Sequence, residues 1–120
     1  MADAPGALAA LFRPSVQGYL ISWFRYDPAR EIAALAAPVL IVHGTTDLQV
    51  SVEDARWLAA ANEGARLLVI PGMNHALKRA VTPEQQTAAY TDASISIDAA
   101  VPDAIASFAG AANAPARSTP

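Results

Sequence analysis

Two short segments of the sequence carry the residue types that could do acid–base chemistry. Residues 43–47 read HGTTD and residues 71–75 read PGMNH, and each segment follows an aliphatic run. A carboxylate that accepts a hydrogen bond from one imidazole nitrogen fixes the tautomer of the ring and leaves the other nitrogen free to act as a general base. Asp47 and His75 are therefore the candidate catalytic residues.

The aliphatic runs before these segments are typical of buried strands. Residues 39–42 (VLIV) and 67–70 (LLVI) are apolar on both faces, which is the pattern of strands covered on both sides in a parallel sheet. Between them, residues 51–54 form a capping box that opens a helix running to about Ala61. We therefore expect residues 39–70 to form one β-α-β unit with a right-handed crossover.

Such a unit would bring the two candidate residues together. The carboxyl ends of neighbouring parallel strands meet at one edge of a sheet, and functional groups collect just beyond that edge. We predict that strands at 39–43 and 66–70 are parallel and adjacent. We also predict that the side chains of Asp47 and His75 lie within hydrogen-bond reach or one water of each other.

The polar and sulfur-containing neighbours have simpler expected roles. His43 is expected to be packed and hydrogen-bonded, while Met73 and Asn74 shape the loop before His75. A metal site formed by His43, Asp47 and His75 is conceivable but not favoured, because these residue types are common. We therefore expect no metal and no other cofactor.

Helices are predicted on the N-terminal side of the unit. Residues 7–12 are compatible with a short helix that Pro14 ends. Residues 16–26 are rich in aromatic and apolar side chains and are predicted to form a buried helix. Its aromatic residues would belong to the core or an interface, or, in a fragment, form an exposed apolar patch. A further helix, capped by Asp27, stops before Pro38.

Two more helices are predicted on the C-terminal side. Residues 82–84 (TPE) form a cap that opens a helix toward Tyr90, and residues 92–97 are expected to be an extended loop. Residues 98–109 are predicted to form a closing helix, because three apolar residues recur at helical spacing. These apolar residues are Val101, Ile105 and Phe108.

Length and composition fit one small α/β domain. The chain has 120 residues, of which 53% are hydrophobic and 16% charged, and this balance excludes an intrinsically disordered chain. The expected fold is α/β, with a small parallel sheet and flanking helices. The domain would span residues 1–110, and residues 111–120 are small, polar and proline-containing, as in a disordered tail.

Charge and hydropathy exclude several classes of partner. The net charge is −3 and the eight basic residues are dispersed, so there is no concentrated basic face for nucleic acid. The longest apolar run, residues 32–42, is too short to cross a membrane and contains Pro38. With no cysteine there is no disulfide, thiolate zinc site or cysteine nucleophile. The compartment stays open, although the N-terminus does not resemble a signal peptide, which favours the cytoplasm.

The order and spacing of these motifs resemble the C-terminal part of an α/β-hydrolase-fold enzyme. That family has a triad in the chain order serine, acid, histidine, and the resemblance implies that Asp47 is the acid and His75 the histidine. Residues 23–28 and the pair at 77–78 are similar to a bacterial branch of esterase-like and serine-aminopeptidase-like hydrolases. The resemblance covers roughly residues 11 to 109.

The sequence also departs from the family. It contains no Gly-x-Ser-x-Gly elbow and no glycine-rich oxyanion loop, so the nucleophile is missing from these 120 residues. The resemblance therefore implies the last third of a serine hydrolase that, as a full-length parent, would cleave a small-molecule ester or amide. The isolated chain is expected to be inactive and to self-associate or bind a chain that supplies the nucleophile. The alternative is a non-catalytic α/β module or split-gene product that folds against a partner.

Overall fold

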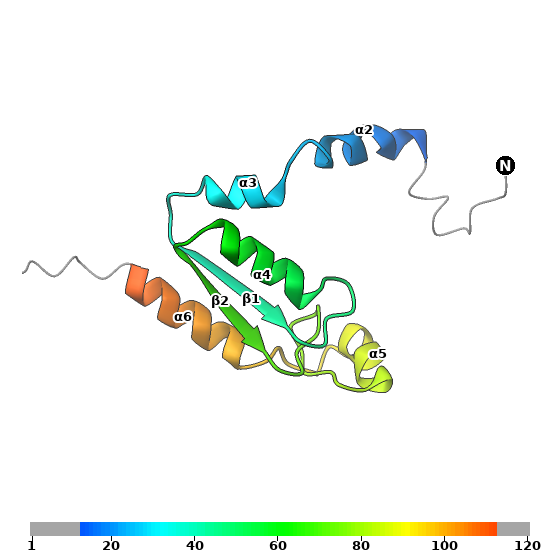
Figure 1. Ribbon diagram of the computed structural model, residues 1–120. Coiled ribbons are helices and arrows are strands. Elements are labelled where there is room, and N and C mark those ends of the chain that lie inside the picture. Colours follow the sequence, from blue (N-terminus) through cyan, green and yellow to red (C-terminus); the bar gives the residue numbers. More distant parts are fainter. Residues whose placement is uncertain (1–12, 113–120) are drawn as a thin grey trace, which may run out of the picture.

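The computed structural model describes residues 13–112 of the chain, so the stretch expected to be helical at 7–12 lies outside them. This part of the chain is a mixed α/β structure with a two-stranded parallel sheet and five helices (Figure 1). In chain order, the elements are α2 (Pro14–Trp23), α3 (Pro28–Ala33), β1 (Val39–Gly44), α4 (Val52–Ala61), β2 (Ala65–Ile70), α5 (Pro83–Thr91) and α6 (Ala100–Ala112).

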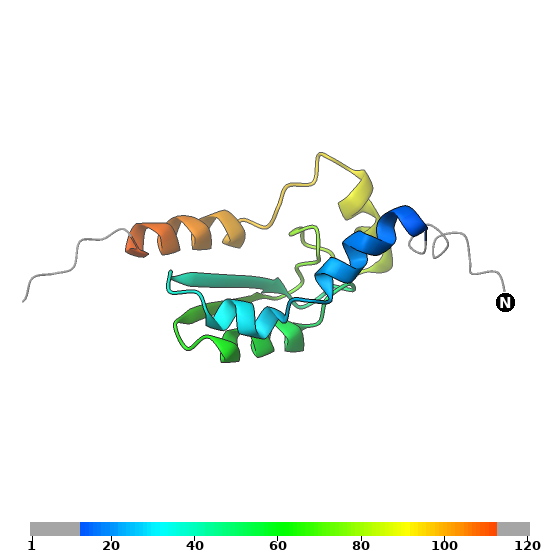
Figure 2. The same cartoon turned by 90° about the horizontal axis from the view of Figure 1, so that it is seen from above.

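The sheet confirms the predicted pairing. β1 and β2 are parallel neighbours, with Val39 opposite Ala65 at one end and Gly44 opposite Ile70 at the other. In Figure 2, α6 lies on one face of the sheet, while α4 and α3 lie on the other. The two strands are thus sandwiched between helices, as their continuous apolar sequences indicated.

The helix between the strands begins as predicted. Ser51 Oγ accepts a hydrogen bond from Asp54 N at 3.2 Å, and Asp54 Oδ2 accepts one from Ser51 N at 3.1 Å, which completes the capping box of α4. At the other end, Asn62 Nδ2 donates to Ile32 O at 2.8 Å, and this bond ties α3 to the end of α4. Capping bonds satisfy backbone groups that a helix terminus leaves without partners.

The other predicted caps are present too. Asp27 Oδ1 accepts from Ala29 N at 3.0 Å at the start of α3. Thr82 Oγ1 accepts from Gln85 N at 3.3 Å, and Gln85 Oε1 accepts from Thr82 N at 3.2 Å, so α5 also begins with a capping box. The sequence located this cap, and the structure identifies Gln85 as its second member.

The core under α6 is small. Its buried members are Ile70, Met73 and Val101, against which Val42 and Leu68 pack. Such a cluster buries little apolar area, because each fully buried aliphatic side chain contributes only about 1.5–3 kcal/mol to stability. The fold of this part of the chain therefore depends on backbone pairing and polar contacts as well as on its core.

The closing helix differs from the prediction at both ends. α6 begins at Ala100 and continues to Ala112, so residues 110–112, expected outside the helix, are helical. The remainder of the expected tail, residues 113–120, lies outside the described residues. Of the predicted apolar stripe, Val101 is buried but Ile105 is 53% exposed. The reason is that the inward side of α6 is formed by Val101, Ala104 and Phe108, the last two of which line a cavity against the strands, so Ile105 lies off this side.

The helix expected to be buried at 16–26 forms, but its burial was predicted wrongly. α2 begins at Pro14, and none of its residues is buried. Trp23 is 59% exposed and Phe24, just after the helix, is 89% exposed. α2 lies apart from the sheet in Figure 1, because α4 and α6 already occupy the two faces of the sheet. The aromatic residues instead form the exposed apolar patch that was the alternative interpretation.

Gly44 is the position where the sheet tolerates no side chain, because the backbone of the loop that follows β2 passes against it. A Cβ at Gly44 would lie 2.0 Å from the carbonyl oxygen of Met73. We predict that Gly44→Ala lowers the free energy of unfolding by more than about 2 kcal/mol, measured by chemical denaturation. The control is Gly110→Ala in α6, where a Cβ meets nothing within 4 Å and should stabilise the helix by up to about 1 kcal/mol. Equal stability of the two variants would contradict the close approach.

Candidate active site

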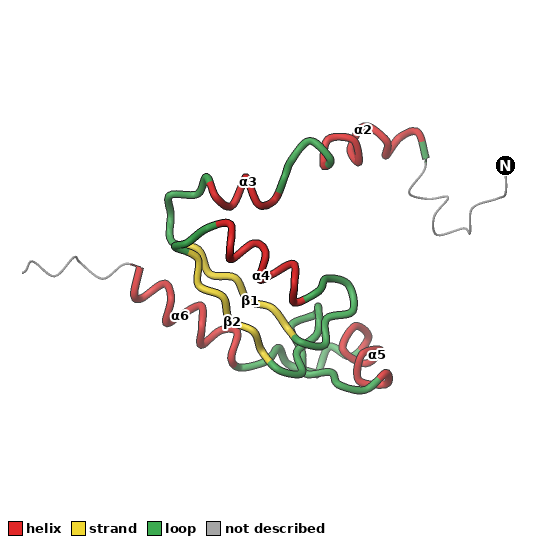
Figure 3. Tube along the Cα trace, viewed as in Figure 1, coloured by secondary structure: helices red, strands yellow, loops and turns green. Residues whose placement is uncertain are grey.

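The loops that follow the two strands are bonded to each other at the carboxyl end of the sheet. Thr45 N donates to Ile70 O at 3.1 Å, and Thr46 N donates to Met73 O at 3.1 Å. Figures 1 and 3 show both loops gathered at this end, beside α5. Parallel pairing therefore places Asp47, which follows Thr46 in the chain, next to the loop that carries the histidine.

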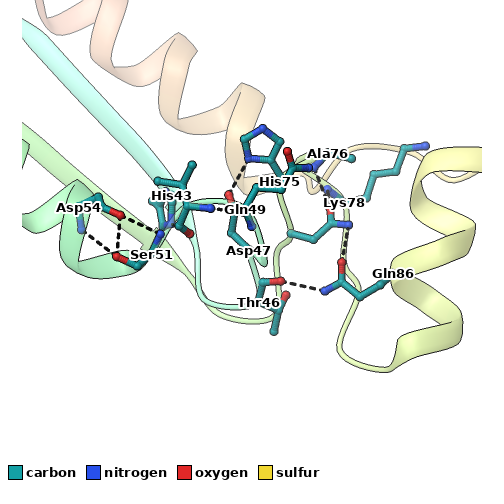
Figure 4. A network of polar contacts seen from close by, with 12 residues as sticks. His43, Thr46, Asp47, Gln49, Ser51, Asp54, His75, Ala76, Lys78 and Gln86 are labelled. Atoms are coloured by element: carbon teal, nitrogen blue, oxygen red, sulfur yellow. Dashed lines mark hydrogen bonds and ion pairs between the residues drawn. The ribbon is translucent and has the colours of Figure 1, made fainter. Parts of the chain in front are cut away.

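The Asp47 carboxylate is held at both oxygens. Oδ1 accepts hydrogen bonds from Gln49 N at 2.8 Å and Val50 N at 3.1 Å. Oδ2 lies 2.9 Å from Nδ1 of His75, so the structure brings together the two residues predicted from the sequence (Figure 4). The side chain of Asp47 is 6% exposed and that of His75 is 44% exposed. A fixed carboxylate thus faces a ring that is open to solvent.

Hydrogen bonds outweigh burial in setting the charge of this carboxylate. Partial burial alone would raise the pKa of Asp47, because it disfavours the ionised form. The N–H of Gln49, the ring of His75 and the N–H of Val50 stabilise the carboxylate, and together they bring its pKa below the ordinary value of 3.8. Asp47 is therefore ionised at neutral pH and can hold a proton on Nδ1 of His75.

The bond to Asp47 defines which ring nitrogen is available for chemistry. When Nδ1 carries the proton and donates it to the carboxylate, Nε2 keeps a lone pair. Figure 4 shows the other nitrogen of the ring pointing away from Asp47. Among the described residues, the only side chain bonded to the His75 ring is that of Asp47. The pair can therefore act as an oriented general base.

Asn74 shapes the loop that presents His75, as predicted. Its side chain is almost fully buried, and Oδ1 accepts hydrogen bonds from Ala76 N at 3.1 Å and Lys78 N at 3.2 Å. The tight loop requires a left-handed backbone at Leu77, with φ of 59°. A side chain in that region is unfavourable by about 1–2 kcal/mol, so the hydrogen bonds of Asn74 hold a strained turn in place.

His43 has the structural role predicted for it. Its Nε2 lies 3.2 Å from Val50 O, in the segment that also donates to Asp47. It lines a small cavity of about 180 Å³ beside the catalytic candidates. Ligand pockets measure roughly 300–1,000 Å³, so this cavity is smaller than one that encloses a whole ligand. The other lining residues are Val42, Gly44, Asp47, Val50, Met73, Asn74, His75 and Leu77.

Three serines of the described region bond to groups other than His75, and one of these is Ser94, whose Oγ donates to Asp92 Oδ1 at 2.6 Å. Ser22 Oγ donates to Tyr19 O at 2.6 Å, and Ser51 Oγ donates to Asp54 Oδ2 at 2.7 Å. Within residues 13–112, no serine is bonded to His75, and no group of three His, Cys, Asp or Glu residues could hold a metal ion. The described site thus contains an acid and a base but presents no nucleophile to the base.

Comparison with known proteins gives no family assignment. No protein-family model matches the chain, and a search of curated proteins finds no match. No helix of residues 13–112 combines the length and apolar character needed to cross a bilayer. The chemical interpretation of the site therefore depends on its geometry and on the motifs in the sequence.

Sequence reasoning did not identify Gln86, on α5, as part of this site. Its Nε2 donates to Thr46 O at 2.8 Å and to Ala80 O at 3.0 Å, and its Oε1 accepts from Asn74 Nδ2 at 3.1 Å. The only signal was a pair of adjacent glutamines in the first turns of a predicted helix. Which of the two faces the loops depends on how α5 docks, and the sequence pattern does not specify that.

The lowered pKa of Asp47 predicts how the stability of the protein changes with pH. A carboxyl whose pKa is lower in the folded than in the unfolded state stabilises the fold above its unfolded pKa, and this contribution is lost as the pH falls through the folded pKa. We predict that Asp47→Asn is less stable than the wild type at pH 6, and that the difference shrinks below pH 3.8, the ordinary value of the group. Unfolding by denaturant at several pH values measures this. A difference that stays constant down to pH 2 would contradict it.

Proposed function

We propose that this chain is the C-terminal part of a serine hydrolase of the α/β-hydrolase fold, which cleaves carboxylic esters or amides by acyl transfer. The observation that carries the proposal is the 2.9 Å contact between His75 Nδ1 and Asp47 Oδ2, at the carboxyl end of two adjacent parallel strands. Motif order adds support, since the acid follows one strand and the histidine the next.

In this mechanism the chain supplies the base and the group that orients it. Nε2 of His75 would take the proton from a serine hydroxyl as its oxygen attacks the substrate carbonyl, and would then give that proton to the leaving alcohol or amine. A water would release the acyl group by the same two proton transfers. Asp47 would keep the proton on Nδ1 and stabilise the positive charge that forms on the ring. The serine and the oxyanion donors would come from a segment outside the described residues.

The magnitudes predict that the 120 residues alone are inactive. Removing the nucleophile of a serine hydrolase lowers turnover by roughly a million-fold, and each oxyanion donor contributes about a hundred-fold or more. We predict no hydrolysis of activated short-chain esters above a His75→Ala control, and no covalent labelling by a fluorophosphonate probe. Labelling on any serine would reveal a nucleophile and would overturn the proposal.

Complementation tests the proposed roles directly. Co-expression with the N-terminal part of a serine hydrolase of this fold, carrying its own Gly-x-Ser-x-Gly, should restore some turnover. In that assembly His75→Ala should abolish activity, and Asp47→Asn should lower it by about ten-thousand-fold through the wrong histidine tautomer. The matched control is His43→Gln, since the ring of His43 is bonded to the Val50 carbonyl. Equal losses from both histidine substitutions would count against a catalytic role for His75.

The second candidate function is that of a non-catalytic module that folds against a partner. It is favoured by the exposed aromatic patch of Tyr19, Trp23, Phe24 and Tyr26, whose exposed fractions are 57%, 59%, 89% and 66%. Within residues 13–112, each strand of the two-stranded sheet also has one edge without a neighbouring strand. Exposed apolar patches and open strand edges both favour association.

The aromatic patch yields its own prediction. We expect the chain to associate in a concentration-dependent manner, because burying these side chains removes apolar area from water. The double variant Trp23→Ser, Phe24→Ser should shift the sedimentation coefficient toward that of a monomer. Trp57→Ser is the matched control, since Trp57 is 53% exposed but lies on α4. A wild-type chain that stays monomeric at all concentrations would refute this expectation.

A further inference from the structure

One side chain on α5 contacts both loops of the candidate site. Gln86 donates from Nε2 to the carbonyl of Thr46, the residue before Asp47. Its Oε1 accepts from the side chain of Asn74, the residue before His75. Figure 4 shows the amide of Gln86 turned toward these loops from its helix. A single glutamine thus joins the backbone next to the acid to the residue next to the base.

We infer that Gln86 is a positioning residue, which holds the acid loop and the histidine loop at the separation that the hydrogen bond between Asp47 and His75 requires. The expected effect of Gln86 on catalysis rests on the proposed function, because Gln86 would affect acyl transfer only by setting the orientation of His75. It goes beyond that proposal by assigning a role to a residue on a separate helix.

The chemistry of the amide fits this role. A glutamine side chain has two N–H donors and a carbonyl acceptor. Gln86 uses all of them, because its second donor bonds to Ala80 O at 3.0 Å. A carboxylate at this position would face the carbonyl oxygens of Thr46 and Ala80 without a proton to share. An aliphatic side chain would leave Asn74, which is 1% exposed, with a side-chain donor that has lost its partner.

The remaining contacts between the loops act elsewhere. The backbone bonds from Thr45 and Thr46, and the bond from Gly72 N to Thr45 Oγ1 at 2.9 Å, join the bases of the loops, close to the strand ends. The side chain of Gln49 reaches Tyr90 OH on α5 at 2.9 Å, but makes no hydrogen bond to the histidine loop. Gln86 is the described side chain that bonds to both loops, and its Asn74 contact continues into the N–H groups that shape the turn after His75.

The neighbouring glutamine provides a matched control. Gln85 lies on the same helix and closes its capping box, with Oε1 accepting from the N–H groups of Val81 and Thr82. Replacing Gln85 weakens α5 without removing a bond to either loop of the site. A comparison of Gln85 and Gln86 variants therefore separates general destabilisation of α5 from the positioning of the pair.

The test reads the tautomer of His75 by NMR on the 120-residue chain labelled with ¹⁵N-histidine. The chain has two histidines, so His43 serves as an internal reference. At alkaline pH, where imidazoles are neutral, the wild type should hold the His75 proton mainly on Nδ1. Gln86→Ala and Gln86→Met should each lower the ratio of the Nδ1–H to the Nε2–H form by about tenfold, which is the effect expected when a hydrogen bond to a charged group is lost. Gln85→Ala should leave the ratio unchanged.

Any of three other outcomes would overturn the inference. An unchanged ratio in folded Gln86 variants would show that the pair forms without this residue, and an equal change in Gln85→Ala would assign the effect to the stability of α5. Loss of the native amide spectrum in both Gln86 variants, with Gln85→Ala folded, would make Gln86 a folding residue rather than a positioning one. The readout requires no turnover, so failure of complementation would refute the proposed function and leave this test standing.

Discussion

The parallel pairing of β1 (Val39–Gly44) and β2 (Ala65–Ile70) is the constraint on which the rest of the described structure depends. Two parallel strands end at the same edge, so the turn after one and the loop after the other must occupy adjacent space. The absence of a side chain at Gly44 allows the Met73 backbone to pass against β1. An antiparallel arrangement of the same strands would put Asp47 and His75 at opposite ends of the sheet.

Pairing alone brings the loops together, and polar groups then fix their geometry. Backbone amides hold the Asp47 carboxylate, and the buried Asn74 side chain holds the strained turn after His75. The side chains of the small apolar core under α6 are apolar, and its members Ile70 and Met73 hold the loops through their backbone carbonyls. Because a buried polar group without a partner is unfavourable by about 1–3 kcal/mol, each of these bonds is costly to break. Precision at the site therefore comes from hydrogen bonds and stability from the sheet and its helices.

The parts of the structure that could be predicted are those with local causes. Capping boxes at Ser51 and Thr82 are encoded within four residues, and continuous aliphatic runs mark strands covered on both faces. The contact between Asp47 and His75 follows from the strand ends. The exposure of α2, the length of α6 and the bonds of Gln86 depend on how helices dock on a sheet of two strands. Apolar composition indicates that a segment can be buried, but whether a surface is available to bury it is a property of the whole fold.

The two members of the Asp47–His75 pair differ in their exposure to solvent. Asp47 is enclosed and fully bonded, whereas the side chain of His75 is 44% exposed and its Nε2 points away from the network. A general base needs its acceptor nitrogen within about 3 Å of the proton that it removes, and it acts best where water is excluded. Neither condition is met by the described residues, since none of them is bonded to Nε2 of His75 and the ring is exposed to water. The aromatic patch near α2 and the outer edges of the two strands are likewise exposed in the described part of the chain. In residues 13–112, the groups without a partner therefore include Nε2 of His75, the buried hydroxyl of Thr46, and the exposed apolar and strand-edge surfaces. Under the proposed function, a further layer of protein that carries a nucleophile would cover both His75 and these surfaces.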